Sequence, residues 1–305
     1  MAVKTKKFNN ITWINIIEPD NNDIKFLVDN YKFHPLDIKD VKGEFQRSKI
    51  DVYNNYAFII LRFPVTYKDS NLIGSHELDI FLGKDYVITI QKKRIKSLNQ
   101  FFYRVGTNKK LQKEIFNGKA ALLLYHILDN LYRASFNIID WLAREINRIE
   151  KAVFEEGTKK IVKDLAQARR NVLAFRAMMD PQRSVFKRIV ILKKDYLSTD
   201  LANYFDDIND FIGRIYTNLT NLKELISGLH ETNESLSSYR LNKVMKVLAI
   251  FSVAMLPLTL LTGIYGMNLS NLPLIHNESL VWYIFGGVAI IIIALFAYFK
   301  HKDII

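Results

Sequence analysis

Residues 247–268 read VLAIFSVAMLPLTLLTGIYGMN and contain no charged side chain. A second uncharged stretch runs from Leu280 to Phe299. Each is about 20 residues long, the length with which a helix crosses roughly 30 Å of hydrocarbon. A buried helix of a soluble protein rarely continues so far without a polar face. The sequence therefore predicts two membrane-spanning helices, at 247–267 and 280–299.

The charges that flank these stretches predict their orientation. Basic residues lie on the outer flanks of the pair, at Arg240, Lys243, Lys246, Lys300 and Lys302. The connecting segment 268–279 has no Lys or Arg, and positive residues mark the cytoplasmic side. The basic, polar N-terminus lacks an export signal. We therefore expect a multi-pass plasma-membrane protein with both termini in the cytoplasm, an external loop at 268–279 and a basic tail at 300–305.

Composition narrows the function classes. The chain has no cysteine, which excludes disulfides and thiolate metal sites. Its net charge of +12 fits either a surface facing anionic membrane lipids or a nucleic-acid binder. We favour the lipid interpretation, with no nucleic-acid partner, because no basic motif interleaved with aromatic residues accompanies the charge.

The N-terminal part reads as a cytoplasmic α/β domain covering residues 1–115. A short helix is expected at Asn22–Tyr31. Alternating apolar and β-branched residues predict strands at Ile11–Ile16, Ile50–Tyr53, Tyr56–Thr66, His76–Leu82 and Tyr86–Gln91. The Asn54-Asn55 pair between two of these strands is typical of a hairpin turn.

A helical period begins near residue 116. Ala120–Glu155 and Lys159–Ile191 predict a long antiparallel pair spanning 116–197, which Pro181 should kink or interrupt. A stalk helix is expected over 198–246. It carries a heptad seam at Ile208, Ile212, Ile215, Leu219, Leu222, Ile226 and Leu229. The seam fits an intramolecular bundle, but its continuity with a membrane span favours contact between several copies of the chain.

One face of the first span is less apolar than lipid contact requires. It presents small, polar and flexible side chains at helical spacing: Asn242, Met245, Leu248, Ser252, Leu256, Thr259 and Gly263. Such a face suits contact with other helices or with water. Ordinary packing of small residues between helices would give the same pattern.

The end of this span carries a specific resemblance. Gly266-Met267-Asn268 follows Tyr265 and an upstream Pro257-Leu258-Thr259, and a second span follows within about a dozen residues. This arrangement resembles the CorA family of magnesium channels. The resemblance covers the whole chain and extends to the segment from Phe33-His34-Pro35 to Gln46-Arg47-Ser48-Lys49. It implies an α+β membrane protein with an N-terminal α/β domain, long antiparallel helices and a stalk helix that continues into the first span.

The resemblance also implies a homopentamer whose first spans line a pore. Gly266, Met267 and Asn268 would form the outer mouth, where amide oxygens meet the entering ion. Further in, Met245, Leu248 and Leu256 would form a hydrophobic constriction, with Asn242, Ser252 and Thr259 as polar positions. Mg²⁺, which prefers oxygen ligands and loses its water reluctantly, would be the transported ion, with Co²⁺ and Ni²⁺ as surrogates.

In this family closure depends on cytoplasmic Mg²⁺ bound between subunits. The matching carboxylates are Asp40, Asp207 and Asp210. Asp206 beside them is more simply a solvated residue at a helix start, and the same interpretation stays open for Asp207. Lys39 stands where an acidic residue would serve a second ion, which argues against two ions at each interface.

Two other functions compete with magnesium transport. A zinc transporter of the same superfamily would share the architecture but differ in the middle of the Gly-Met-Asn triplet, where Met267 matches the magnesium type. A membrane-anchored scaffold would need neither this triplet nor the polar face of the first span. An enzyme is not expected, because no phosphate-binding Gly-rich loop and no catalytic spacing of Ser, His, Asp or Glu stands out.

Overall fold

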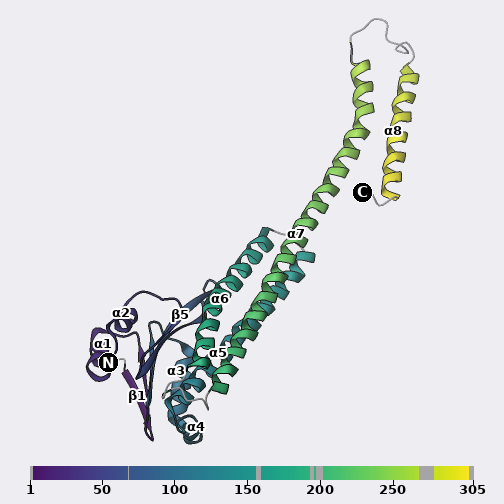
Figure 1. Cartoon of the computed structure of the whole chain (residues 1–305). Helices are drawn as coiled ribbons and strands as arrows, with labels where there is room; N and C mark the ends of the chain where they lie inside the picture. Colours follow the sequence, from purple (N-terminus) through teal and green to yellow (C-terminus); the bar gives the residue numbers. More distant parts are fainter. Residues whose placement is uncertain are drawn as a thin grey trace. The chain divides into compact units, whose positions relative to one another are not determined.

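The computed structural model of this chain describes residues 3–67, 69–155, 159–192, 196, 202–267 and 278–301. The chain divides into two compact units, Met1–His230 and Glu231–Ile305. Figure 1 shows the elements of both. Each unit is described by itself below. Helix α7 (Ala202–Tyr265, 64 residues) begins in the first unit and ends in the second.

A six-stranded sheet forms the centre of the first unit, in the order β1-β2-β6-β5-β4-β3. The strands are β1 (Val3–Phe8), β2 (Ile11–Ile17), β3 (Lys49–Val52), β4 (Tyr56–Tyr67), β5 (Leu72–Gly83) and β6 (Tyr86–Gln91). Among the strands that the structure describes, β2 and β6 pair in parallel and the other neighbours pair antiparallel. The five strands predicted from alternation are confirmed. The sequence analysis missed β1, a lysine-rich edge strand whose composition hid its pairing with β2.

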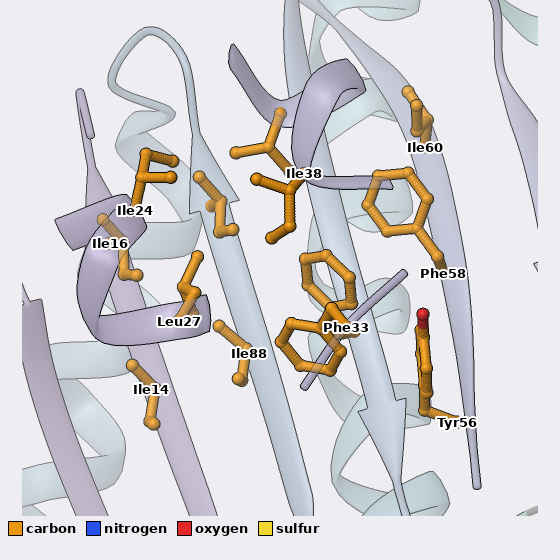
Figure 2. Close-up of a cluster of buried hydrophobic side chains, with 13 residues drawn as sticks. Ile14, Ile16, Ile24, Leu27, Phe33, Ile38, Tyr56, Phe58, Ile60 and Ile88 are labelled. Carbon is orange, nitrogen blue, oxygen red and sulfur yellow. The ribbon is translucent and has the colours of Figure 1, made fainter. Parts of the chain in front are cut away.

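Two short helices cover one face of the sheet: α1 (Asn21–Tyr31) and α2 (Pro35–Lys42). Apolar side chains from both helices and from four strands form a closed cluster between them and the sheet (Figure 2). Asp20 and Asp23 cap α1 reciprocally, each side chain accepting from the other's backbone N–H. Pro35 begins α2, where its missing N–H costs no hydrogen bond. This face fixes the position of Asp40 on α2.

The opposite face of the sheet is covered by longer helices (Figure 1). They are α3 (Lys96–Thr107), α5 (Ala120–Glu155) and α6 (Lys159–Ile191), and both α5 and α6 contact β4 and β5. The short helix α4 (Lys109–Ile115) packs against α3 and α5. The predicted bounds of α5 and α6 are confirmed. An interruption at Pro181 is not found, because α6 continues through it. The adjacent Gln182 amide donates to the Met178 carbonyl at 2.9 Å and to the Arg62 carbonyl at 2.7 Å, holding this turn on the sheet.

The N-terminal part of α7 packs against α5 and α6 within the first unit. The Arg176 and Arg183 guanidinium groups each lie 4.8 Å from the centre of the Tyr216 ring. Six of the seven seam residues are at most 5% exposed in the single chain: Ile208, Ile212, Ile215, Leu219, Ile226 and Leu229. The prediction that this seam joins several copies is therefore wrong. Intramolecular packing uses the same three- and four-residue spacing, and here it covers the seam.

The second unit holds the end of α7 and helix α8 (Glu278–His301). Both helices are long and apolar enough to cross a bilayer, with a mean hydropathy of 2.2 in their spanning windows. On α7 the side chains of Ile250 and Ala254 are buried, and the Tyr265 ring lies 6.2 Å from that of Phe285 on α8. The two candidate membrane spans therefore contact each other through these two aromatic rings.

One buried carboxyl group in the sheet gives a pH-dependent prediction. Asp79 and Glu77 on β5 are both 0% exposed, and Glu77 Oε1 lies 2.5 Å from Lys92 Nζ. Among the described residues, neither Asp79 oxygen has a hydrogen-bond partner. Burial, followed by the charge of Glu77, raises the pKa of the Asp79 carboxyl well above its ordinary value. The folded chain thus keeps a proton on Asp79 that the unfolded chain releases. The free energy of unfolding therefore falls as the pH rises above the pKa that Asp79 has in the unfolded chain.

Asp79→Asn is expected to remove this loss, because an amide has no proton to release. The melting temperature of the full-length variant in detergent should exceed that of the unmodified protein by a few degrees at pH 8. Well below pH 3.8, the ordinary pKa of an Asp carboxyl, Asp79 carries its proton in both states, and the two melting temperatures should agree. The same substitution at Asp29, which is exposed on α1, is the control. Equal pH dependence of Asp79→Asn and the unmodified chain would contradict the protonated Asp79.

Candidate ion pathway and regulatory carboxylates

The membrane part of α7 has two different faces. Ile250 and Ala254, at 9% and 1% exposure, lie on the face of α7 that carries Tyr265, whose ring contacts Phe285 on α8. The sequence-predicted pore positions lie on the opposite face at three- and four-residue steps, and all are exposed in the single chain: Asn242, Met245, Leu248, Ser252, Leu256 and Thr259. In a 3.6-residue helix these two sets are about half a turn apart. The structure therefore brings the predicted pore residues together on a surface that α8 does not cover.

The hydroxyl groups on this face present acceptors. Ser252 Oγ donates to the Leu248 carbonyl at 2.9 Å, and Thr259 Oγ1 donates to the Met255 carbonyl at 2.9 Å. Each hydroxyl proton is thus engaged inside the helix, and the remaining lone pairs of the oxygen are free for another donor or a cation. The face offers neutral oxygen atoms and carries no charge between Val247 and Met267.

Large apolar side chains alternate with these hydroxyls. Met245, Leu248 and Leu256 are 56%, 59% and 65% exposed in the single chain. Exposed apolar side chains of this size on one helix face indicate a surface that another helix, lipid or a narrow dewetted passage must cover.

The end of α7 requires glycine at one position. The Gly266 N–H donates to the Thr262 carbonyl at 2.8 Å, and the Met267 N–H donates to the Ile264 carbonyl at 3.3 Å. A Cβ atom at Gly266 would lie 2.9 Å from the Thr262 backbone oxygen, so any other residue would displace this turn. Met267 is 54% exposed. Asn268, the third predicted mouth residue, lies outside the described residues.

Two of the predicted regulatory carboxylates share a groove. Asp207 and Asp210 stand one helical turn apart near the start of α7. They line a groove of about 740 Å³ together with Phe136, Gly213, Arg214, Thr217 and Asn218. The hydroxyl and amide of Thr217 and Asn218 add oxygen ligands of the kind that Mg²⁺ prefers. The groove therefore brings two carboxylates and two neutral oxygen-bearing side chains together with the guanidinium group of Arg214.

Asp207 also has a partner on α5. The Tyr125 hydroxyl donates to Asp207 Oδ2 at 3.1 Å. Burial of the ring, followed by this hydrogen bond, raises the pKa of Tyr125 to about 12. Tyr125 therefore remains a donor throughout the physiological range and fixes one oxygen of Asp207. The sequence analysis did not single out Tyr125, because nothing in the α5 pattern marks which tyrosine faces α7.

Asp40 lies elsewhere, at the end of α2, and does not line the groove. Its Oδ2 atom is 2.7 Å from Lys49 Nζ, which also lies 2.6 Å from Asp51 Oδ2. Within the described residues, no group of three or more His, Cys, Asp or Glu side chains lies close enough to hold a metal ion. Across the described part of the molecule, one chain alone therefore does not join Asp40 and Asp207 in a metal site. Lys39 is exposed beside Asp40.

The backbone at Asp40 is held by a second lysine. Lys92 Nζ donates to the carbonyls of Asp40, Gly43 and Glu44 at 3.0, 3.0 and 3.1 Å, and pairs with buried Glu77. Lys92 directly follows β6. Its ammonium group donates to carbonyls at and just after the end of α2, where helix carbonyls lack partners within the helix. The sequence analysis missed Lys92 and Lys49. The alternation of Lys49 and Asp51 on a strand was a usable signal, because it places both side chains on one face.

These features can be compared with known proteins. The family model described as CorA-like Mg²⁺ transporter protein matches residues 8–301. The chain belongs to this family. It is therefore a CorA-family divalent cation transporter with two candidate membrane-spanning helices. The family is one of membrane transporters and not a class of enzymes.

Individual relatives agree with this assignment. The cobalt/magnesium transport protein CorA of Thermotoga maritima is 29% identical over 295 residues, covering 95% of this chain and 82% of the relative. The putative metal ion transporter YfjQ of Bacillus subtilis is 25% identical, and the match covers 95% of this chain and 88% of the relative. The structure of the CorA magnesium transporter of Methanocaldococcus jannaschii matches with a TM-score of 0.83 at 20% identity, over 97% and 92% of the chains. This CorA-family fold thus extends over nearly the whole chain.

Proposed function

We propose that the chain forms a homopentameric channel that admits Mg²⁺ to the cytoplasm, and also Co²⁺ and Ni²⁺, and that closes when cytoplasmic Mg²⁺ rises. The named relatives from Thermotoga maritima and Methanocaldococcus jannaschii are cobalt/magnesium transporters. The observation that carries the proposal is the exposed face of α7 opposite α8. In a ring of subunits this face would line the axis, while α8 would lie outside it.

The chemistry of this face suits a hydrated divalent cation. Ser252 and Thr259 present acceptor oxygens. The face carries no carboxylate, which would bind the ion too tightly for flux. Mg²⁺ can keep much of its water shell while neutral oxygens accept hydrogen bonds from that water. Met245, Leu248 and Leu256 would close the passage by excluding water. Entry into a negatively charged cytoplasm gains ~2.3 kcal/mol per charge per 100 mV, and twice that for a divalent ion.

The membrane orientation follows from charge and from aromatic residues. Basic residues flank both spans on the same side, so we place both termini in the cytoplasm of the cell and the loop 268–279 outside. Trp282 and Tyr283 near the start of α8 are 77% and 78% exposed. Aromatic residues of this kind gather at the membrane interface, which supports an outer interface at this end of α8.

Regulation is proposed at the subunit boundary. The groove with Asp207, Asp210 and Asn218 offers hard oxygen donors, and Asp40 is partly exposed at the end of α2. An ion bound between Asp207 or Asp210 of one subunit and Asp40 of a neighbour would tie the cytoplasmic domains together. Loss of that ion would release them and allow the α7 helices to move apart.

Ion entry into liposomes tests the proposal directly. Purified full-length protein should admit Mg²⁺, with Co²⁺ and Ni²⁺ also entering and with entry falling as internal Mg²⁺ rises. Better entry of Zn²⁺ than of Mg²⁺ would support the zinc branch of the superfamily instead. No entry of any of these ions, at any internal Mg²⁺ or voltage, would leave a membrane-anchored scaffold as the function. Cross-linking in the same liposomes should give a ladder that ends at five subunits, and a ladder ending at two would contradict the pore.

A further inference from the structure

A lysine ammonium group occupies the space between two carboxylates at the end of α2. Lys49 Nζ lies 2.7 Å from Asp40 Oδ2 and 2.6 Å from Asp51 Oδ2. Lys49 and Asp51 alternate on β3 and so share one face of the sheet. The Lys49 ammonium also lies 5.8 Å from the centre of the Phe58 ring on β4. A cation of the chain itself therefore already satisfies the charge of Asp40.

This position is both accessible and fixed. The side chain of Asp40 is 22% exposed, and those of Lys49 and Asp51 are each 39% exposed, so an ion from solvent can reach all three. The backbone of Asp40 is held by Lys92 Nζ on its carbonyl at 3.0 Å and by the Gly43 N–H at 3.2 Å. Asp51 is fixed in register opposite Phe58. The two carboxylates can thus exchange one cation for another without movement of α2 or β3.

The chemistry of the pair fits such an exchange. Mg²⁺ typically binds through one or two carboxylates and keeps several of its waters. Two aspartates that converge on one ammonium group therefore have a spacing that a hydrated Mg²⁺ can bridge. The ion and the ammonium group cannot both occupy this position, because like charges at that separation repel strongly.

We propose that Lys49 is a built-in competitor for the regulatory ion at Asp40, and that Asp51 is a second carboxylate of that site. This inference rests on the proposed function, in which cytoplasmic Mg²⁺ binds at Asp40. At low Mg²⁺ the ammonium group offsets the negative charge of the two carboxylates, and no metal ion binds there. At high Mg²⁺ the ion displaces Lys49 from both carboxylates. The strength of the Lys49 contacts therefore sets the Mg²⁺ concentration at which the site fills.

Mg²⁺ titration of thermal stability tests the competition without any need for transport. Full-length protein in detergent is heated at increasing Mg²⁺, and the concentration giving half of the maximal rise in melting temperature is recorded. Lys49→Met should lower this concentration about tenfold, because removing the ammonium leaves both carboxylates to the ion. Lys49→Arg keeps the charge and should remain near the unmodified value. Asp51→Asn should raise the Mg²⁺ concentration at the half-point, because it removes one of the two carboxylates. Lys163→Met, an exposed lysine of α6, is the matched control.

The outcomes separate this inference from the channel itself. An unchanged half-point in Lys49→Met, a shift equal to that of Lys163→Met, or the absence of any Mg²⁺-dependent stabilisation would overturn the competition. If the half-point is unchanged while Mg²⁺ flux and its inhibition are normal, the proposed function stands and the role of Lys49 fails. If liposomes show no flux while Lys49→Met still lowers the half-point, the channel fails and the competition stands.

Discussion

Replacing Asn268 with alanine is expected to reduce Mg²⁺ influx about 100-fold or more, with the fold and the assembly retained. The proposed pore mouth presents one Asn268 amide from each subunit to an ion that enters with its water shell. An amide oxygen accepts hydrogen bonds from this water, and a methyl group cannot. A loss of roughly 1 kcal/mol in each of five subunits would already exceed a hundredfold in rate. The measurement is Mg²⁺ entry into liposomes at low internal Mg²⁺.

The geometry just before Asn268 explains why its placement should matter. The α7 helix ends in a turn that only Gly266 permits, because an added Cβ would meet the Thr262 carbonyl at 2.9 Å. The Met267 N–H closes the same turn on Ile264. The direction in which the chain leaves the helix is therefore fixed by backbone contacts of the described residues.

The control for this prediction is the same substitution at Asn117, an exposed residue in the turn between α4 and α5. Asn117→Ala should leave Mg²⁺ entry unchanged. Cross-linking and melting temperature of Asn268→Ala establish that assembly and folding are preserved. Normal influx in an assembled Asn268→Ala channel would refute the placement of the pore mouth at this residue.

Local pattern was sufficient to predict the long elements. The period of 3.6 residues gave the bounds of α5 and α6, and alternation gave β2 and β6. It failed where an element is short or lacks an apolar stripe. β1 is a lysine-rich edge strand, and α2 has only eight residues, beginning at Pro35 after the N-cap His34. Such elements form because the rest of the sheet offers them a partner, and a single sequence window does not contain that partner.

The candidate site divides along the same line. Helical spacing alone placed Ser252, Leu256 and Thr259 on one face of α7. What the spacing could not show is which side α8 covers, since either face of an apolar helix can pack. For the seam at Ile208–Leu229 the spacing predicted contact between copies of the chain, whereas the seam is buried within one chain. Intramolecular and intersubunit packing share one periodicity, so the spacing alone does not distinguish them. The partners of Asp40 and Asp207 are Lys49 on β3, Lys92 directly after β6 and Tyr125 on α5. They depend on tertiary placement and could not be read from the helix that carries each aspartate.

Replacing Asp207 with lysine is expected to raise the internal Mg²⁺ concentration that halves influx by about tenfold or more. The change removes a carboxylate ligand from the groove and adds a positive charge that repels the ion. Asp210 and Asn218 would remain, but the groove would carry less negative charge. Influx at low internal Mg²⁺ should be unaffected, because Asp207 lies in the unit Met1–His230 and outside the α7 face that lines the proposed pore. The measurement is flux into liposomes preloaded with a series of Mg²⁺ concentrations.

Two further variants separate ion binding from packing. Asp206→Lys makes the same charge change one residue earlier, at an exposed position outside the groove, and should leave the inhibition curve in place. Tyr125→Phe removes the hydrogen bond to Asp207 Oδ2 but keeps the carboxylate. If Tyr125→Phe shifted the curve as far as Asp207→Lys, the α5–α7 contact would be the cause. If Asp207→Lys and Asp206→Lys both left the curve unchanged, Asp207 would only solvate the start of α7. A shift confined to Asp207→Lys therefore identifies its carboxylate as a ligand of the inhibitory ion.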